Sequence, residues 1–240
     1  MTLDGSTALI TGAGRGIGRA VALGFAGRGC NVALAARTRA ELEAVRAEAA
    51  ALGAQSLALC CDVARPEDVA EVVAATRSEF GAVDILVNNA GAASFKPIWD
   101  VTLDEWRRAF EVNVTGAFLF IQAVLPDMMA RRSGRIINIS SVTGLKALPR
   151  QSAYGAAKHA LNSLTKSLQL ELREYGIAAH MICPGAVDTR LSREAMPERD
   201  PEDWMTPEDI AQAALYLASL SPRVAVDLLS MRRFPSEPLT

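Results

Sequence analysis

Short, continuously apolar runs alternate along the chain with longer stretches of helical periodicity, and this alternation restricts the fold more than any other feature. The runs are rich in Val, Ile and Leu and are too short to form independent helices. They span residues 7–11, 31–36, 56–61, 84–87, 135–140, 177–183 and 224–231. Because the runs do not alternate between apolar and polar residues, they are typical of strands covered on both faces.

The stretches between the runs carry apolar residues at three- and four-residue spacing, as amphipathic helices do. Residues 104–131 and 152–175 each show one such stripe, and residues 38–52 form a shorter one that ends before Gly53. This alternation predicts an α/β fold, a doubly wound Rossmann-type parallel sheet of about seven strands with helices on both faces. Since the sequence contains no repeat or clear linker, we expect residues 1–240 to form a single domain.

The composition is that of an ordinary globular protein, with 50% hydrophobic and 22% charged residues. The formal net charge of -2 gives no bulk attraction to nucleic acid or to an anionic membrane, so neither is expected as a partner. The first apolar run begins close to Met1 and leaves no room for a signal peptide, and no run approaches the ~20 residues of a membrane span. We therefore expect a cytoplasmic protein.

Cysteine and histidine give no indication of a metal site. The four cysteines lack the spacing of metal ligands and lie in or beside apolar runs, so we interpret them as reduced core thiols. They are Cys30, Cys60, Cys61 and Cys183. Histidine is the usual acid/base side chain near neutral pH. His159, on a helical stretch, and His180, inside an apolar run, are nevertheless interpreted as structural.

A glycine-rich turn follows the first apolar run and leads into a helix that begins near Arg15. Its pattern is Gly12-x-x-x-Gly16-x-Gly18, with Ile17 between the last two glycines. Glycines permit a tight turn and let backbone N–H groups approach a pyrophosphate, which the partial positive charge of a helix N-terminus also attracts. A plain turn is the alternative, but the position between a strand and a helix favours dinucleotide binding.

Further motifs follow the later strands in a fixed order. They are Asp62-Val63 after the third run, Asn88-Asn89-Ala90-Gly91 after the fourth, Asn113 on the next helix, Ser141 after the fifth run, Tyr154 and Lys158 on the following helix, and Pro184-Gly185, Val187 and Thr189 after the sixth. Together with the glycine-rich turn, these motifs resemble the short-chain dehydrogenase/reductase family up to about Ala218.

The resemblance implies an oxidoreductase that moves a hydride between a nicotinamide cofactor and a carbonyl or alcohol carbon. The implied catalytic residues are Asn113, Ser141, Tyr154 and Lys158. The implied cofactor-binding residues are Gly12, Gly16, Ile17, Gly18, Asp62, Val63, Asn89, Gly91, Tyr154, Lys158, Pro184, Gly185, Val187 and Thr189. Asn88 is expected to brace adjacent strands instead, and Asp62 has the alternative role of an N-cap.

Elementary chemistry supports the same catalytic residues. Tyr154 and Lys158 lie four residues apart on a helical stretch and share a face. A tyrosine hydroxyl has a pKa of about 10, which a nearby ammonium group and an oxidised nicotinamide are expected to lower. Ser141 can hydrogen-bond the substrate oxygen, and the family assigns Asn113 a water that relays protons from Lys158. Each residue alone has an ordinary structural explanation, but the full set favours catalysis.

The second apolar run indicates which nicotinamide cofactor is used. NAD-dependent enzymes commonly end this strand with an acid that binds the ribose hydroxyls, whereas this chain has Ala36 followed by Arg37. Arg15 adds a second guanidinium near the same ribose, and two guanidinium groups suit a 2′-phosphate. Solvated surface charges are the alternative for both arginines. The sequence therefore predicts NADP(H).

The C-terminal part departs from the pattern common in the family. The usual Asp-Gly-Gly close is missing, and residues 232–240 read as an irregular tail. The tail is more similar to reductases of small hydroxy acids and oxo compounds than to 3-oxoacyl thioester reductases, but both substrate classes stay open. Residues 190–206 lie where the family has its substrate lid, and Arg190 and Arg193 there are either solvated or meet a substrate anion. Arg131 and Arg132 end a long helical stretch, where positive charge interacts favourably with the helix dipole. Docking of an acyl carrier protein is the alternative role for these two arginines.

The sequence thus predicts an NADP(H)-dependent oxidoreductase acting on a small-molecule carbonyl or alcohol. A non-catalytic nucleotide sensor or scaffold of the same fold is the alternative. A sensor has no chemical need for the serine, tyrosine and lysine, so their presence favours the enzyme. The helical stretches 104–131 and 152–175 resemble those through which the family dimerises, so a homo-dimer or homo-tetramer is expected.

Overall fold

The computed structural model describes residues 3–238 and contains one parallel sheet with the strand order β3-β2-β1-β4-β5-β6-β7. Every neighbouring pair of strands runs parallel, which confirms the predicted doubly wound α/β fold. The strands are β1 (Thr7–Thr11), β2 (Asn31–Ala36), β3 (Ser56–Cys60), β4 (Ile85–Asn88), β5 (Gly134–Ile139), β6 (Ile177–Pro184) and β7 (Leu228–Met231).

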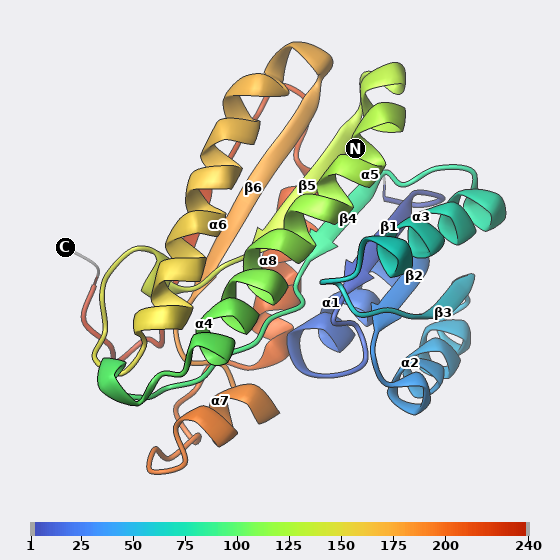
Figure 1. Cartoon of the computed structure of the whole chain (residues 1–240). Helices are drawn as coiled ribbons and strands as arrows, with labels where there is room; N and C mark the ends of the chain where they lie inside the picture. The colour runs from blue at the N-terminus through green and yellow to red at the C-terminus, as the bar shows by residue number, and fades with distance from the viewer. Residues whose placement is uncertain (1–2, 239–240) are drawn as a thin grey trace.

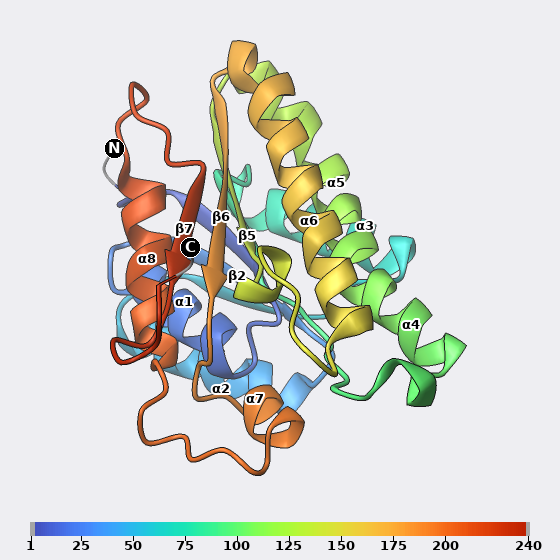
Figure 2. The ribbon, with the colours of Figure 1, turned by 90° about the vertical axis from the view of Figure 1, so that its left-hand side faces the viewer.

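Helices connect the strands and cover both faces of the sheet (Figure 1). They are α1 (Gly16–Ala26), α2 (Arg39–Ala51), α3 (Pro66–Phe80), α4 (Leu103–Phe110), α5 (Gly116–Arg131), α6 (Ser152–Glu171), α7 (Arg190–Ala195) and α8 (Pro207–Ser219). Figure 2 shows the sheet nearly edge-on, with α1 and α8 on one side and α3, α5 and α6 on the other.

Two hydrophobic cores lie on opposite faces of the sheet, which explains why the strand sequences are continuously apolar. Ala8 and Ile10 of β1 pack into the core beneath α1, α2 and α8, whereas Leu9 packs into the core beneath α3, α5 and α6. All three side chains are fully buried. A strand placed between two helical layers therefore needs apolar residues at every position.

The strand order reverses direction at β1, which pairs with β2 on one side and β4 on the other. The chain segments that follow β1 and β4 therefore leave the sheet toward opposite faces, and a crevice opens at their carboxyl ends. The glycine-rich turn after β1 and the Asn-Asn-Ala-Gly segment after β4 both lie at this edge of the sheet.

The single helix expected over residues 104–131 is interrupted. It consists of α4, a π-helical turn (Glu111–Thr115) and α5. The apolar spacing continues through the interruption, so periodicity alone does not reveal it, and such π-turns are frequent at functional sites. Asn113 lies inside the π-turn, so the interruption sets the direction of one of the predicted catalytic side chains.

The same helical segment also corrects the expectation that nothing in the chain approaches a membrane span. Leu103–Arg131 is long and apolar enough to cross a membrane, judged by length and composition alone. Its inner side is built into the core, where Phe120 and Met128 are completely buried and Val124 nearly so. Packing between the sheet and the neighbouring helices therefore accounts for the apolar character of this inner side.

Most expected boundaries of strands and helices differ from the structure by no more than one residue, and larger differences lie at three other places. The last strand covers Leu228–Met231 rather than 224–231, and α6 ends at Glu171 before a short 3-10 turn, Arg173–Tyr175. The lid segment 190–206 contains the short helix α7. The described part of the tail, 232–238, has no helix or strand, and residues 239 and 240 lie outside the described part of the chain.

Cys60 contradicts the interpretation of all four cysteines as core thiols. Cys30, Cys61 and Cys183 are buried, but Cys60 is exposed. It is the last residue of β3, which forms an edge of the sheet, and its two neighbours in sequence point to the other face.

Candidate active site

The glycine-rich turn has the backbone geometry that only glycine adopts easily. Gly12 and Gly16 have φ values of 65° and 53°, in the left-handed region. Gly18 lies in the first turn of α1, where an added Cβ would stand 2.1 Å from the carbonyl oxygen of Gly12. The glycines therefore allow β1 to turn sharply into α1, with Arg15 as the last residue before the helix.

Hydrogen bonds join this turn to the segment after β4. The Asn89 side-chain amide donates to the carbonyl oxygens of Thr11 and Gly12, at 2.9 and 3.3 Å. The Thr11 hydroxyl accepts the backbone N–H groups of Asn89 and Ala90, both at 3.0 Å. Asn88 instead donates to the Asn138 side chain across β4 and β5 at 2.9 Å, which agrees with its expected bracing role.

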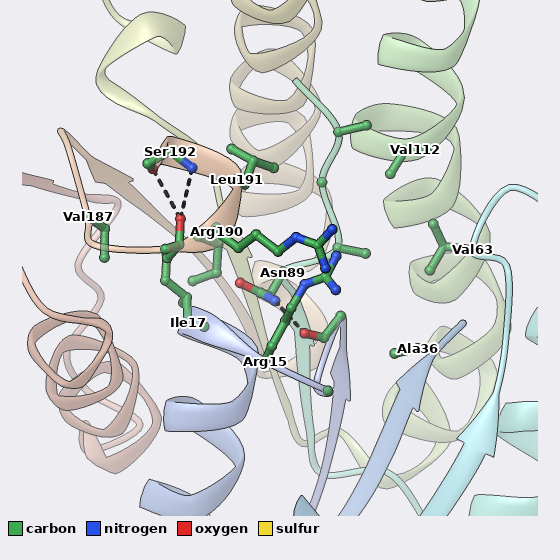
Figure 3. A pocket seen from close by; sticks show the side chains of 18 of the residues that line it. Arg15, Ile17, Ala36, Val63, Asn89, Val112, Val187, Arg190, Leu191 and Ser192 are labelled. Carbon is green, nitrogen blue, oxygen red and sulfur yellow. Dashed lines mark hydrogen bonds between the residues drawn. The ribbon is translucent and has the colours of Figure 1, made fainter. Parts of the chain in front are cut away.

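A groove runs along the carboxyl edge of the sheet and is seen from close by in Figure 3. Nearly all the predicted site residues line it. They are Gly12, Arg15, Gly16, Ile17, Arg37, Asp62, Val63, Asn89, Gly91, Ser141, Tyr154, Lys158, Pro184, Gly185, Val187 and Thr189. Two predicted residues do not line the groove: Gly18, buried behind the turn, and Asn113.

Asn113 lies behind the groove, beside a small separate cavity. Its amide nitrogen donates to the carbonyl oxygens of Ala92 and Ala109, both at 2.8 Å, and ties the segment after β4 to the π-turn. Its carbonyl oxygen is buried without a partner among the described residues. A Cβ added to Gly91 would lie 3.1 Å from this oxygen and 3.9 Å from Lys158 Nζ, so both groups flank Gly91.

Tyr154 and Lys158 lie one helical turn apart at the groove end of α6, and Lys158 Nζ is 5.6 Å from the centre of the tyrosine ring. The lysine is 3% exposed, and its ammonium donates to the backbone oxygen of Ile139 at 2.9 Å. On its other side the tyrosine ring contacts Phe95, with 5.7 Å between ring centres. Strand β5 thus holds the ammonium group of Lys158, whereas Tyr154 stays partly exposed where it lines the groove.

Burial shifts both ionisable groups toward their neutral forms. It raises the pKa of Tyr154 to about 12, although the hydrogen bond with the Ser141 hydroxyl acts in the opposite direction. Burial lowers the pKa of Lys158 to about 8. The expectation that Lys158 depresses the pKa of Tyr154 is therefore wrong for the free protein, because the loss of solvation outweighs the hydrogen bond with Ser141, and Lys158 adds no resolved lowering effect.

Ser141 is held in place by a residue that the sequence did not single out. Its hydroxyl oxygen accepts the backbone N–H of Thr143 at 3.2 Å and the Thr143 hydroxyl at 2.9 Å. The Ser141 hydroxyl in turn donates to the backbone oxygen of Pro184 at 3.5 Å. Ser141 is also the N-cap of the 3-10 turn Val142–Gly144, so its ordinary structural role and its place in the groove coexist.

The far end of the groove is lined by charged residues, two of which were not expected. Arg108, from α4, is 3.2 Å from Asp62 Oδ2. Burial acts to raise the pKa of Asp62, but the backbone N–H of Ala64 and this guanidinium lower it overall. Glu41, from α2, forms an ion pair with Arg15 at 2.8 Å. Arg37 lines the same end and makes no hydrogen bond or ion pair within residues 3–238.

The two arginines of segment 190–206, which the sequence predicts to be a substrate lid, behave differently. Arg193 is bound by both carboxylate oxygens of Asp188, at 2.6 and 2.9 Å, and does not line the groove. Arg190 pairs with Glu194 at 2.6 Å and lines the groove. Figure 3 shows its side chain reaching across the mouth toward Arg15. The lid therefore contributes one cation to the groove.

The histidines occupy positions outside the groove. His159 is exposed, and its Nδ1 contacts the Gly155 carbonyl oxygen one turn earlier in α6. His180 is buried in β6, with Nδ1 2.8 Å from the Val226 carbonyl oxygen. Within residues 3–238, no group of three or more His, Cys, Asp or Glu side chains could hold a metal ion.

Comparison with known proteins places the chain among oxidoreductases. The chain is 36% identical over 234 residues to the D-beta-hydroxybutyrate dehydrogenase of Rhizobium meliloti (strain 1021). The aligned region covers 88% of this chain and 91% of the relative. The structure of an alcohol dehydrogenase from the archaeon Thermococcus sibiricus, complexed with 5-hydroxy-NADP, matches with a TM-score of 0.90 and 30% identity, over 98% of this chain and 99% of the other.

An NAD+-bound xylitol dehydrogenase matches almost as well, with a TM-score of 0.86 and 29% identity over 96% of this chain and 98% of the other. The structural neighbours therefore include both NADP-bound and NAD-bound proteins. The family model for short chain dehydrogenase matches residues 6–200, which include the glycine-rich turn, Ser141, Tyr154 and Lys158. The chain belongs to the short-chain dehydrogenase family.

Proposed function

We propose that this oxidoreductase transfers a hydride between NADP(H) and the carbonyl or alcohol carbon of a small substrate, with Tyr154 as the acid/base. Its family acts on alcohols and ketones. One observation carries the proposal: Ser141, Tyr154 and Lys158 line one end of the same groove that has Arg15 and Arg37 at the other. Chemistry and cofactor recognition are thereby joined in a single site.

The nicotinamide, when bound, supplies or accepts the hydride, and the residues of the chain handle the proton. With a pKa of about 12, Tyr154 carries its proton at neutral pH and can donate it to a carbonyl oxygen that gains negative charge. The Ser141 hydroxyl can hydrogen-bond the same oxygen. In the oxidation direction Tyr154 accepts the proton, and positive charge nearby favours its ionised form.

The residues of the groove fit a dinucleotide. The turn between β1 and α1 leaves no room for a Cβ at Gly18 and presents the N-terminus of α1 to the groove, as a pyrophosphate site requires. Asp62 and Val63 line the groove beyond the end of β3 and would flank the adenine. Pro184, Gly185, Val187 and Thr189 would lie along the nicotinamide end, where Ser141 is also found.

The choice of NADP(H) rests on charge at the adenosine end. Ala36 ends β2 without a carboxylate, and Arg15 and Arg37 both line the groove beside it. Guanidinium groups suit a phosphate because they offer charge-assisted, bidentate hydrogen bonds. The carboxylate of Glu41 also lies here and works against this preference, without removing the two cations.

Substrate class and assembly are part of the proposal. Similarity to a hydroxybutyrate dehydrogenase favours small hydroxy or oxo acids, with 3-oxoacyl thioesters as the second class to test. The catalytic roles of Asn113, Ser141, Tyr154 and Lys158, a cytoplasmic location and a homo-oligomeric state are proposed on the grounds given above. A nucleotide sensor without turnover is the competing function.

The test is a screen of hydride transfer with NADPH and NADH against ketones, oxo acids, 3-oxoacyl thioesters and the corresponding alcohols. We expect turnover with at least one small oxo or hydroxy acid, and a higher kcat/KM with NADPH than with NADH. Binding of both cofactors without turnover of any compound in the screen would support the sensor instead. Turnover with a higher kcat/KM for NADH would contradict only the cofactor assignment.

A further inference from the structure

Glu41 places a carboxylate in the part of the groove where the ribose 2′-phosphate of NADP(H) is expected. It lies in the first turn of α2 and lines the groove together with Arg15, Ala36 and Arg37. Its carboxylate is 2.8 Å from Arg15, so one of the two proposed phosphate ligands is already paired with an anion of the protein itself.

The position of Glu41 relative to the end of β2 is informative. A Cβ added to Gly14 would lie 3.0 Å from Glu41 Cβ, 3.1 Å from Glu41 Oε2 and 3.8 Å from Ala36 Cβ. Glu41 therefore packs on the glycine-rich turn, next to the strand end. The acid that is missing at position 36 in the sequence is replaced in space by an acid from the following helix.

Arg190 brings a further cation toward the same carboxylate. Figure 3 shows its side chain extending from the lid toward Arg15. The attraction of Glu41 contributes, after the larger effect of Glu194, to raising the pKa of Arg190. Glu41 thus pairs with Arg15 and attracts Arg190 more weakly, because Arg190 is itself paired with Glu194.

The ion pair is suited to rearrangement. The side chains of Arg15 and Glu41 are 51% and 33% exposed, so solvent screens the pair and little free energy is needed to separate it. A 2′-phosphate that binds Arg15 meets the carboxylate at close range, and like charges a few ångströms apart repel each other. A ribose hydroxyl, by contrast, can donate a hydrogen bond to a carboxylate.

We propose that Glu41 is a specificity-determining residue that competes with the cofactor's 2′-phosphate for Arg15 and so limits the preference for NADP(H) over NAD(H). This inference rests on the proposed function, since it assumes that the groove binds a nicotinamide dinucleotide. Glu41 touches no substrate, and its effect is confined to the adenosine end of the cofactor.

The experiment compares Glu41→Gln with the wild type in equilibrium binding of NADPH, NADH and the fragments 2′,5′-ADP and 5′-AMP. Glutamine keeps the size of the side chain and removes its charge. We expect NADPH and 2′,5′-ADP to bind about five- to tenfold more tightly, as repulsion between charges near a protein surface allows. NADH and 5′-AMP should change by less than about twofold, because they carry no 2′-phosphate.

Two controls isolate the charge effect. The first control is Glu43→Gln. Glu43 lies on the same helix, pairs with Arg39 and Arg46 and does not line the groove, so this variant should change none of the four affinities. The gain from Glu41→Gln should shrink in about 1 M NaCl, where the Debye length is about 3 Å. A change in packing at the turn would not depend on salt in this way.

Unchanged or weaker binding of NADPH by Glu41→Gln would overturn the inference, and weaker binding would indicate that Glu41 orients Arg15 for the phosphate. An equal gain for NADPH and NADH would also overturn it. The proposed function fails differently: wild-type protein would bind neither cofactor, whereas a preference for NADH over NADPH would contradict only the cofactor assignment. Even if the proposed function fails in this way, tighter binding of 2′,5′-ADP by Glu41→Gln, without tighter binding of 5′-AMP, would support the role of Glu41.

Discussion

Tyr154 and Lys158 are shifted in opposite directions by the same cause. Their polar ends lie among β5, the Phe95 ring and α6, where neither charged form is well solvated. The tyrosine therefore keeps its proton and the lysine releases its proton more readily than in water. In the proposed reduction, a tyrosine held in its protonated form is ready to donate its proton.

The lowered pKa of Lys158 predicts how the stability of the folded protein depends on pH. Its pKa falls from 10.5 to about 8 on folding, so between pH 8 and 10.5 the unfolded chain holds a proton that the folded protein has released. Stability from this group therefore rises with pH across that window. The free energy of unfolding of the wild type, minus that of Lys158→Met, should grow by about 3 kcal/mol between pH 7 and 10.

Chemical denaturation at a series of pH values measures this difference. The window stops at pH 10 because of Tyr154, whose pKa is raised to about 12. Between pH 10 and 12 the unfolded chain loses this proton and the folded protein keeps it, so the contribution of Tyr154 to stability falls as the pH rises. A difference that is flat from pH 7 to 10 would show that Lys158 is not desolvated in the folded protein.

Thr143 is expected to act by positioning Ser141. Thr143→Val removes the hydroxyl that donates to Ser141 Oγ and keeps the backbone N–H that also donates to it. Loss of one such hydrogen bond should lower kcat about five- to twentyfold, with KM for the cofactor unchanged. Thr143→Ser restores the hydroxyl and should restore the rate. If Thr143→Ser is as slow as the valine variant, the hydroxyl has no such role.

At the scale of elements, the turn from β1 to α1 and the π-turn before α5 shape the groove. The first brings the start of α1 close to β4, where Asn89 bonds to the turn. The second directs Asn113 toward the segment after β4. Both turns bring side chains of one segment onto backbone oxygens of another, so local backbone geometry and tertiary contact depend on each other.

Substitution of Gly18 tests how tightly the first turn is packed. In Gly18→Ala the added Cβ meets the Gly12 carbonyl oxygen at 2.1 Å, a backbone atom that cannot move without distorting the turn. We expect at least tenfold weaker NADPH binding and a loss of about 2 kcal/mol or more in stability. Gly27→Ala is the matched control at the end of the same helix, where φ is -66° and space is available, so it should be neutral or slightly stabilising.

The sequence predicted the elements best where local pattern and burial agree. β1, β2 and the start of α1 follow from continuous apolar runs and from glycines with a steric need. The π-turn was missed because its apolar residues keep the spacing of an α-helix. Glu41, Arg108 and Thr143 were missed because their neighbours come from packing between elements or from a short 3-10 turn, neither of which has a sequence signature.

At the scale of the whole molecule, α5 and α6 lie on the same face of the sheet (Figure 2). Both helices expose large apolar side chains. Phe118 of α5 is 44% exposed and Leu170 of α6 is 72% exposed. Burial of such side chains against a second copy would release free energy at the helices that the sequence suggested for dimerisation. We expect light scattering at micromolar concentration to report a multiple of 25.6 kDa. A particle of 25.6 kDa would contradict this expectation.

In the proposed function, one groove joins a cofactor end and a catalytic end, so the catalytic claim can be tested while the cofactor end stays intact. Tyr154→Phe removes only the hydroxyl that we propose transfers the proton and keeps the ring that contacts Phe95. The measurement is kcat with saturating NADPH and the best substrate of the screen, together with the Kd for NADPH. We predict that kcat falls at least about a hundredfold, as loss of general acid–base catalysis allows, and that the Kd stays within about twofold. A variant that keeps more than about a tenth of the wild-type rate would contradict the assignment of Tyr154 as the acid/base.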